Sequence, residues 1–269
     1  LKKITQSLKK IFQYLSSDQQ QRLAGIGLAQ PDKISKWGEV FGVDSNILSQ
    51  WDDVNIIDEI KNLAPQYEVI RMNDVYAACL SELFLGNPNK HTDFLYIYLG
   101  TFVGGAIVLN GQLFNTDQLN ASSIGTIPIH TSGGHRQLIG VASLNSLEQD
   151  LKKTGFDPKL LTTEKKLPPA VRLMFDSWLE HALEGIKWSI VSVNSVIGTD
   201  LVLIDAHLNK TLIAEINSKL KNLLENFHWE ATEPAVIESG SVGKQARALG
   251  SAIIPFNSTY GLSQNTLLK

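Results

Sequence analysis

The hydrophobic positions of this chain switch repeatedly between helical and strand spacing. Near the N-terminus, apolar residues recur every three or four positions, which predicts an amphipathic helix over residues 1–20. Short, nearly continuous apolar runs follow, and each predicts a buried strand because its length is typical of strands. We expect strands over residues 22–29, 67–70, 94–99, 106–109, 124–129, 201–204 and 234–237.

Helical spacing returns between these strands. Asp53 is expected to cap a short helix through residues 56–60. Further helices are predicted over residues 74–86, 143–154, 169–193, 212–224 and 246–253. Pro169 fits the first turn of its helix, where proline costs no hydrogen bond, and Pro255 is expected to stop the last helix. Strands that alternate with helices predict an α/β fold.

The middle of the chain predicts a hairpin with a glycine-rich kink. Two apolar runs flank a glycine loop over residues 100–105, and the second run ends at Asn110-Gly111. Asn-Gly next to an apolar run is a strong signal for a tight hairpin turn. Glycine inside a strand marks a bulge or the close approach of another group, so Gly104 and Gly105 are candidates for backbone contact with a ligand.

Composition narrows the class of protein. The chain has 269 residues, which is long enough for two lobes. Its formal charge of −3 gives no electrostatic attraction for nucleic acid. A single cysteine, Cys79, excludes an internal disulfide and a cysteine-based zinc site, and it fits the cytoplasm. No apolar run is long enough for a membrane span. The chain begins at Leu1 inside a helical pattern, which suggests a fragment of a longer protein.

Five separated motifs resemble the ROK family (repressors, open reading frames and sugar kinases). They are Gly25-Ile-Gly-Leu-Ala29 with Pro31, Asn73-Asp74, Leu99-Gly-Thr-Phe-Val-Gly-Gly105 with Asn110-Gly111, Ile124-Gly125 with Pro128, and Arg247-Ala-Leu-Gly-Ser-Ala252. The resemblance implies the two-lobed, actin-like ATPase (ribonuclease H-like) fold. It implies a small lobe over residues 1–92, rejoined by 251–269, and a large lobe over 93–250.

Other details resemble the bacterial ROK transcriptional regulators. These details are Gln30-Pro31 before the Trp37 segment, Asp93-Phe94-Leu95-Tyr96, Leu203-Ile204-Asp205, and Ala248-Leu-Gly-Ser-Ala with Pro255. In such regulators a helix-turn-helix precedes a sugar-sensing domain. The 269 residues contain neither this helix-turn-helix nor the family's opening strands with their phosphate loop, so the small lobe is expected to be incomplete.

The resemblance assigns sugar contact to Asn73 and Asp74. A sugar kinase needs a carboxylate to take the proton from the attacking hydroxyl, and Asp74 matches that base. A carboxylate at a helix start is also explained by capping and by attraction to the helix dipole. An aspartate in this place can hydrogen-bond a sugar hydroxyl whether or not it acts as a base.

Three departures from the kinase pattern remove phosphate and metal chemistry. Phe102 stands where kinases of the family carry another glycine, and phosphate cradles rely on bare backbone amides. The kinases' sugar- and zinc-binding Glu-x-Gly-His segment corresponds to residues 123–126, so Ser123 and Thr126 replace a carboxylate and an imidazole. The three zinc cysteines are missing as well, and zinc held by thiolates needs the thiolates. We therefore expect no bound metal.

The remaining candidates are weaker. His130 and His135 flank a glycine loop and are more simply explained as exposed loop residues, although His135 is also a candidate for the sugar pocket. Gly100 and Thr101 in the first glycine loop, and Gly240 and Gly243 before the last helix, are weak candidates for nucleotide contact. Lys244 and Arg247 are expected to be surface residues rather than phosphate ligands.

These patterns favour a non-catalytic, sugar-sensing domain of a ROK-type regulator. A monosaccharide or sugar phosphate is expected between the two lobes, with no cofactor, in a homodimer that reaches DNA only through a helix-turn-helix outside this chain. The expected contacts are Asn73, Asp74, Gly104, Gly105, Ser123, Thr126 and His135. The alternative is an ATP-dependent hexose kinase with Asp74 as general base, and only this alternative calls for ATP and Mg²⁺.

Overall fold

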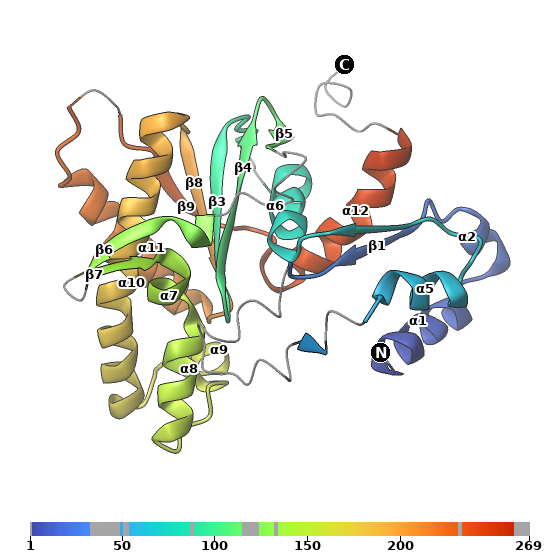
Figure 1. The fold of residues 1–269 in the computed structure, drawn as a ribbon, viewed down its shortest axis with the longest axis horizontal. Helices are drawn as coiled ribbons and strands as arrows, with labels where there is room; N and C mark the ends of the chain where they lie inside the picture. Colours follow the sequence, from blue (N-terminus) through green and yellow to red (C-terminus); the bar gives the residue numbers. More distant parts are fainter. Residues whose placement is uncertain are drawn as a thin grey trace. The chain divides into compact units, whose positions relative to one another are not determined.

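The computed structural model describes residues 2–32, 49–50, 54–86, 89–114, 124–131, 134–230 and 233–260 (Figure 1). The chain divides into two compact units. Unit 1 comprises Leu1–Ser81 and Gln245–Lys269, and unit 2 comprises Glu82–Lys244. The boundaries expected from sequence lay after residues 92 and 250.

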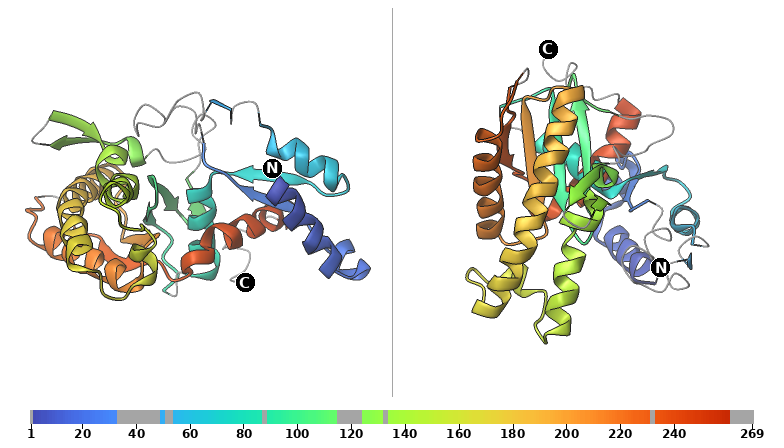
Figure 2. Two further views of the ribbon diagram at one scale, coloured as in Figure 1. Left: turned by 90° about the horizontal axis from the view of Figure 1, so that it is seen from below. Right: turned by 60° about the vertical axis from the view of Figure 1, so that its left-hand side comes forward.

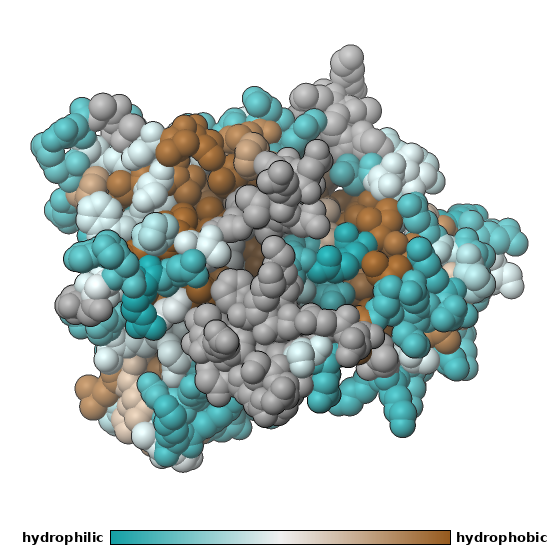
Figure 3. Space-filling model, in the orientation of Figure 1, coloured by the Kyte–Doolittle hydropathy of each residue, from teal (hydrophilic) through white to brown (hydrophobic). Residues whose placement is uncertain are grey.

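Unit 1 is built on two short parallel strands. Strand β1 (Ile26–Ala29) pairs with β2 (Val69–Met72), with Ile26 opposite Val69. Its helices are α1 (Lys2–Tyr14), α2 (Ser17–Gln21), α5 (Ile56–Leu63), the first part of α6 (Asp74–Leu85), and α12 (Ala246–Tyr260). Ile56, Ile60 and Val69 form a small apolar core. The surfaces of α1, α2 and α5 that face the viewer in Figure 3 are mostly hydrophilic.

Three local predictions for unit 1 were wrong in detail. The single helix expected over residues 1–20 is broken, because Ser16 leaves the helical conformation and forms a capping box with Gln19 at the start of α2. The cap of α5 is Asn55, whose side chain accepts from the Asp58 N–H, whereas Asp53 lies outside the described residues. The strand expected from residue 22 begins at Ile26.

Helix α12 packs closely against its neighbours because glycines remove the side chains between them. A Cβ atom on Gly27 would lie 1.7 Å from the Ser251 carbonyl oxygen, and one on Gly250 would lie 1.6 Å from the Ala77 carbonyl oxygen. The expected stop at Pro255 was wrong, since the helix continues to Tyr260. Pro255 lacks the N–H that would bond the Ser251 carbonyl, and that carbonyl lies against Gly27 instead.

Unit 2 contains a five-stranded sheet in the order β5-β4-β3-β8-β9. The strands are β3 (Phe94–Leu99), β4 (Val103–Leu109), β5 (Gln112–Leu113), β8 (Leu201–Ala206) and β9 (Val236–Ser239). Strand β3 runs antiparallel to β4 and parallel to β8, which is parallel to β9. All residues of β3 and β8 are buried, as expected for continuous apolar runs at the centre of a sheet.

The predicted Asn-Gly hairpin turn is confirmed, and it joins β4 to β5. Asn110 and Gly111 both have positive φ angles, of 52° and 72°, as a type I′ turn requires. The glycine loop is shorter than expected, because β4 already begins at Val103. Gly104 and Gly105 are therefore strand residues opposite Tyr98 and Ile97 rather than loop residues.

Helices and a small hairpin complete unit 2. They are η2 (Ile124–Thr126), β6 (Pro128–Thr131), β7 (Gly134–Gln137), α7 (Leu138–Ala142), α8 (Leu144–Lys153), α9 (Leu160–Thr163), α10 (Pro169–Val196), α11 (Lys210–Glu225) and η3 (Gly243–Gln245). The strand expected over 124–129 starts as a turn of 3₁₀ helix and becomes extended only at Pro128. The long helix from Pro169 is confirmed and lies beside α7, α8 and α11 (Figures 1 and 2).

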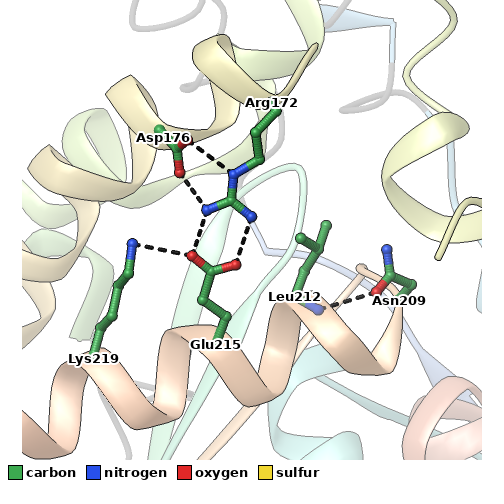
Figure 4. Close-up of polar contacts among 6 residues, drawn as sticks. All are labelled: Arg172, Asp176, Asn209, Leu212, Glu215 and Lys219. Carbon is green, nitrogen blue, oxygen red and sulfur yellow. Dashed lines mark hydrogen bonds and ion pairs between the residues drawn. The ribbon is translucent and has the colours of Figure 1, made fainter. Parts of the chain in front are cut away.

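A network of charged side chains ties α10 to α11 (Figure 4). Arg172 on α10 donates to both carboxylate oxygens of Glu215 on α11, at 2.5 and 2.7 Å, and also to Asp176 one turn along its own helix. Lys219 contacts Glu215 at 3.0 Å. These cations hold the pKa of Glu215 down at about 2.

None of the helices that the structure describes is long and apolar enough to cross a membrane.

Candidate functional site

A hollow of about 340 Å³ lies in unit 1, beyond the carboxyl end of β1. Ligands of open α/β sheets bind outside the carboxyl ends of parallel strands, where loops and helix starts bring polar groups together. The hollow is lined by Ala29, Pro31, Asp74, Arg247, Ala248 and Ser251. Its only charged lining residues, among those that the structure describes, are Asp74 and Arg247.

Asp74 is the first residue of α6, and its carboxylate faces Arg247. The Arg247 guanidinium donates to Asp74 Oδ2 at 3.3 Å. The Asp74 side chain is 16% exposed, whereas that of Arg247 is 45% exposed. Burial raises the pKa of Asp74, and the neighbouring Arg247 partly opposes this shift. The carboxylate is therefore a sheltered group in an ion pair, with the guanidinium on the more open side.

Asn73 has a structural task beside the hollow. Its side-chain oxygen accepts from the Val75 and Tyr76 N–H groups and thereby caps α6. Its amide nitrogen donates to Asp32 at 2.9 Å, and Asp32 also pairs with Arg71 at the end of β2. This network fixes the start of α6, so Asn73 holds Asp74 in place and does not itself line the hollow.

Arg247 reaches Asp74 because of the close packing of α12. It stands in the first turn of that helix, three residues before Gly250, which lets α12 approach α6 at Ala77. The expectation that Arg247 is a plain surface residue was incomplete, because the side chain is half exposed and also lines the hollow. Asp32, Arg71 and Ser251 were not singled out in the sequence. The available signals were the position of Asp32 just after a strand and a proline, and the place of Ser251 in the Arg247–Ala252 motif.

The glycine pair of β4 has a packing explanation. A Cβ atom on Gly105 would lie 2.7 Å from the Tyr96 carbonyl oxygen and 2.8 Å from Ile124 Cγ1, so a side chain does not fit. Gly104 is half-buried in the same strand. The prediction that another group lies close to Gly105 is confirmed. Within unit 2 the close groups are the Tyr96 carbonyl oxygen and the Ile124 side chain.

The other predicted sugar contacts that the structure describes in unit 2, Thr126 and His135, do not line the larger hollow of that unit. Thr126 is half-buried at the end of η2, and Ser123 lies outside the described residues. His135 is exposed on β7, where its ring contacts that of His130 across the hairpin at a centroid distance of 5.0 Å. A larger hollow of about 780 Å³ does exist in unit 2, but its lining, which includes Arg136 and Trp178, contains none of these residues.

The first glycine loop holds the start of α8. The Gly100 and Thr101 carbonyl oxygens accept from the Leu144 and Asn145 N–H groups at 2.9 and 3.2 Å. The Val103 N–H donates to the Ser143 hydroxyl at 2.9 Å. These contacts show that the loop is fixed by the chain's own helix, and that the Val103 amide is already engaged.

The second glycine turn is filled by a buried carboxylate. Glu82, on the last part of α6, is 1% exposed. It accepts from the Ser241 and Val242 N–H groups at 3.1 and 2.8 Å and from the Ser241 hydroxyl at 2.9 Å. A Cβ atom on Gly240 would lie 3.0 Å from Glu82 Oε1, so glycine makes room for the carboxylate. The Gly240–Gly243 turn was suggested as a place for an anionic ligand, and its amides bind the Glu82 carboxylate of the same chain.

A second buried carboxylate lies at the carboxyl end of β8. Asp205 is 4% exposed, accepts from the Tyr96 hydroxyl at 3.3 Å, and receives the Ala206 N–H at 2.8 Å. Within the described ranges, no group of three or more His, Cys, Asp or Glu side chains is arranged to hold a metal ion. Cys79, the single cysteine of the sequence, is buried.

Two units of this architecture, with a sheltered aspartate at a helix start after a parallel strand, define a protein with the actin-like ATPase fold of the sugar kinases. The chain belongs to the ROK family, which it matches over residues 2–255. It is similar to a ROK family protein from Streptococcus pneumoniae TIGR4 solved in complex with sucrose. That structure aligns with a TM-score of 0.68 at 15% identity, covering 97% of this chain and 88% of the other.

Relatives from both branches of the family are found. A ROK family transcriptional regulator, a homologue of the E. coli MLC protein, aligns with a TM-score of 0.51 at 19% identity, covering 78% of this chain and 57% of that one. The glucokinase of Halalkalibacterium halodurans is 34% identical over 112 residues, which are 42% of this chain and 33% of the enzyme. The matched segment thus spans a third of that enzyme. Family and fold are confirmed, and both functions occur among the relatives.

Proposed function

We propose that the chain is a non-catalytic, sugar-sensing domain of a ROK-type transcriptional regulator. The sugar would occupy the hollow of unit 1, where Asp74 accepts hydrogen bonds from its hydroxyl groups. The observation that carries the proposal is the ion pair between Asp74 and Arg247. A general base must point its carboxylate at the attacking hydroxyl, whereas Asp74 Oδ2 is already engaged by the Arg247 guanidinium at 3.3 Å.

Features of unit 2 support the same conclusion. Phosphoryl transfer depends on backbone amides and cations placed around the phosphates. The amides of Val103, Ser241 and Val242 are engaged by the chain's own oxygen atoms.

As a regulator, the chain would act in the cytoplasm as a homodimer. Ligand binding would change the population of two conformations of the dimer, and DNA contact would come from a helix-turn-helix in a longer chain. The ligand is a monosaccharide or a sugar phosphate, and no cofactor is required.

A second function, an ATP-dependent hexose kinase with Asp74 as base, is favoured by one observation. This is the 34% identity to a glucokinase over 112 residues. In that case ATP and Mg²⁺ would be required, and the hollow would hold the acceptor sugar.

Calorimetry distinguishes the two functions. The protein is titrated with a panel of hexoses, N-acetylhexosamines, pentoses and their phosphate esters, and separately with Mg-ATP. The sensor binds at least one sugar and no ATP, and Asp74→Asn weakens sugar binding about 10-fold or more. Asp18→Asn is the matched control, because this aspartate also pairs with an arginine of unit 1 but is 70% exposed. Saturable ATP binding that is enhanced by sugar would contradict the sensor and favour the kinase.

A further inference from the structure

We propose that Arg247 selects an anionic monosaccharide, one that carries a phosphate or carboxylate group, in the unit 1 hollow. This inference rests on the proposed sugar-binding function and narrows the class of ligand. From the sequence, Arg247 was expected to be a surface residue.

The two charges of the hollow differ in how they face a ligand. Asp74 is the more sheltered partner, at 16% side-chain exposure, and Arg247 is the more open one, at 45%. The other lining residues, Ala29, Pro31, Ala248 and Ser251, are small and carry no charge. A molecule that enters therefore meets the guanidinium on the open side of the ion pair, and the carboxylate behind it.

A second ion pair lies beside the start of α6. Asp32 and Arg71 form their own ion pair, which also holds Asn73 at the start of α6. A ligand with hydroxyl groups at one end and an anionic group at the other would satisfy both partners of the ion pair.

The chemistry of arginine favours an anion over a neutral hydroxyl in this place. A guanidinium presents paired N–H donors that match the two oxygens of a phosphate or carboxylate, and such charge-assisted hydrogen bonds are about twice as strong as neutral ones. Lysine would supply the charge without the planar fork. The hollow of about 340 Å³ has room for a single sugar ring with its substituent.

Matched ligand pairs test the inference. Binding to the full chain is measured by calorimetry for hexoses and N-acetylhexosamines, their 6-phosphates, the corresponding hexuronates, and inorganic phosphate. The phosphate and uronate arms separate the two sources of the anionic group. At least one anionic sugar should bind about 10- to 100-fold more tightly than its neutral counterpart, with affinity that falls as salt is raised. Inorganic phosphate alone should bind weakly.

Variants test whether Arg247 itself recognises the anionic group or whether any positive charge near the hollow has the same effect. Arg247→Gln should remove the preference for the anionic member of each pair. Arg247→Lys should keep part of the preference. Lys244→Gln, which removes the same charge from an exposed neighbouring position, should keep it all. Equal affinity for neutral and anionic sugars, with Arg247→Gln affecting both alike, overturns the inference while sugar sensing stands. Binding of no sugar at all overturns both.

Discussion

Replacing Glu215 by glutamine should destabilise unit 2, and the effect should depend on pH. Arg172 binds both oxygens of Glu215 in a bidentate pair that joins α10 to α11 (Figure 4). The pKa of Glu215 falls from 4.5 to about 2 in the folded chain. A shift of this size corresponds to a contribution of at most about 3 kcal/mol to the free energy of unfolding. The side chains of Arg172 and Glu215 are 36% and 22% exposed, so solvent screening reduces the expected loss to about 1–1.5 kcal/mol.

The sign of the pH dependence follows from the direction of the shift. Because the folded pKa lies below the unfolded one, the stabilisation is fully present above about pH 4.5 and is lost as the pH falls towards 2. Urea unfolding of the wild-type chain and of Glu215→Gln, followed by circular dichroism at several pH values, measures this difference. It should shrink by about half or more between pH 7 and pH 3.

The matched control is Glu225→Gln, on the same helix. Glu225 pairs with Lys221 at 3.8 Å, and the two side chains are 55% and 61% exposed, so this substitution should change the free energy of unfolding by less than about 0.5 kcal/mol. The reasoning fails if Glu215→Gln is as mild as the control at pH 7, or if its effect is the same at pH 7 and pH 3.

Three further substitutions test the packing that positions the site and the caps of unit 2. Gly250→Val should cost at least about 3 kcal/mol in unfolding free energy, because its Cβ would collide with the Ala77 carbonyl oxygen, and an unchanged melting temperature would contradict that packing. Glu82→Gln should cost about 2–3 kcal/mol by removing a buried carboxylate from three donors, and faster amide hydrogen exchange at Ser241 and Val242 is the readout. Asn209→Ala should cost about 1 kcal/mol, because the Asn209 side chain caps α11 by accepting from the Leu212 N–H (Figure 4), and an unchanged urea midpoint would speak against this cap.

Most of the fold was predictable because its signals are local. The Asn110-Gly111 turn, the buried runs of β3 and β8, and the long helix from Pro169 each follow from a few neighbouring residues. Errors arose where tertiary packing overrides a local signal. Pro255 lies inside a helix although it has no N–H to donate to the Ser251 carbonyl. That carbonyl lies against Gly27 instead.

The candidate site was predictable only in part. Asp74 at a helix start after a strand stood out, and the hollow contains it. Its partner Arg247 is 173 residues away in the chain, and the contact depends on two glycines that let α12 approach β1 and α6. Glu82 was missed for a related reason. A glutamate in the apolar part of a helix carries no local sign of the turn whose amides it will bind.

The most direct test of the central claim is ATP turnover by the purified chain. ADP release is followed in a coupled assay with Mg-ATP and each sugar of the panel, for the wild-type chain and for Asp74→Asn. A sensing domain gives no sugar-dependent ADP release for either protein, at concentrations where calorimetry shows that the sugar is bound. Sugar-dependent release by the wild-type chain that disappears in Asp74→Asn would show that Asp74 acts as a catalytic base, and would contradict the account.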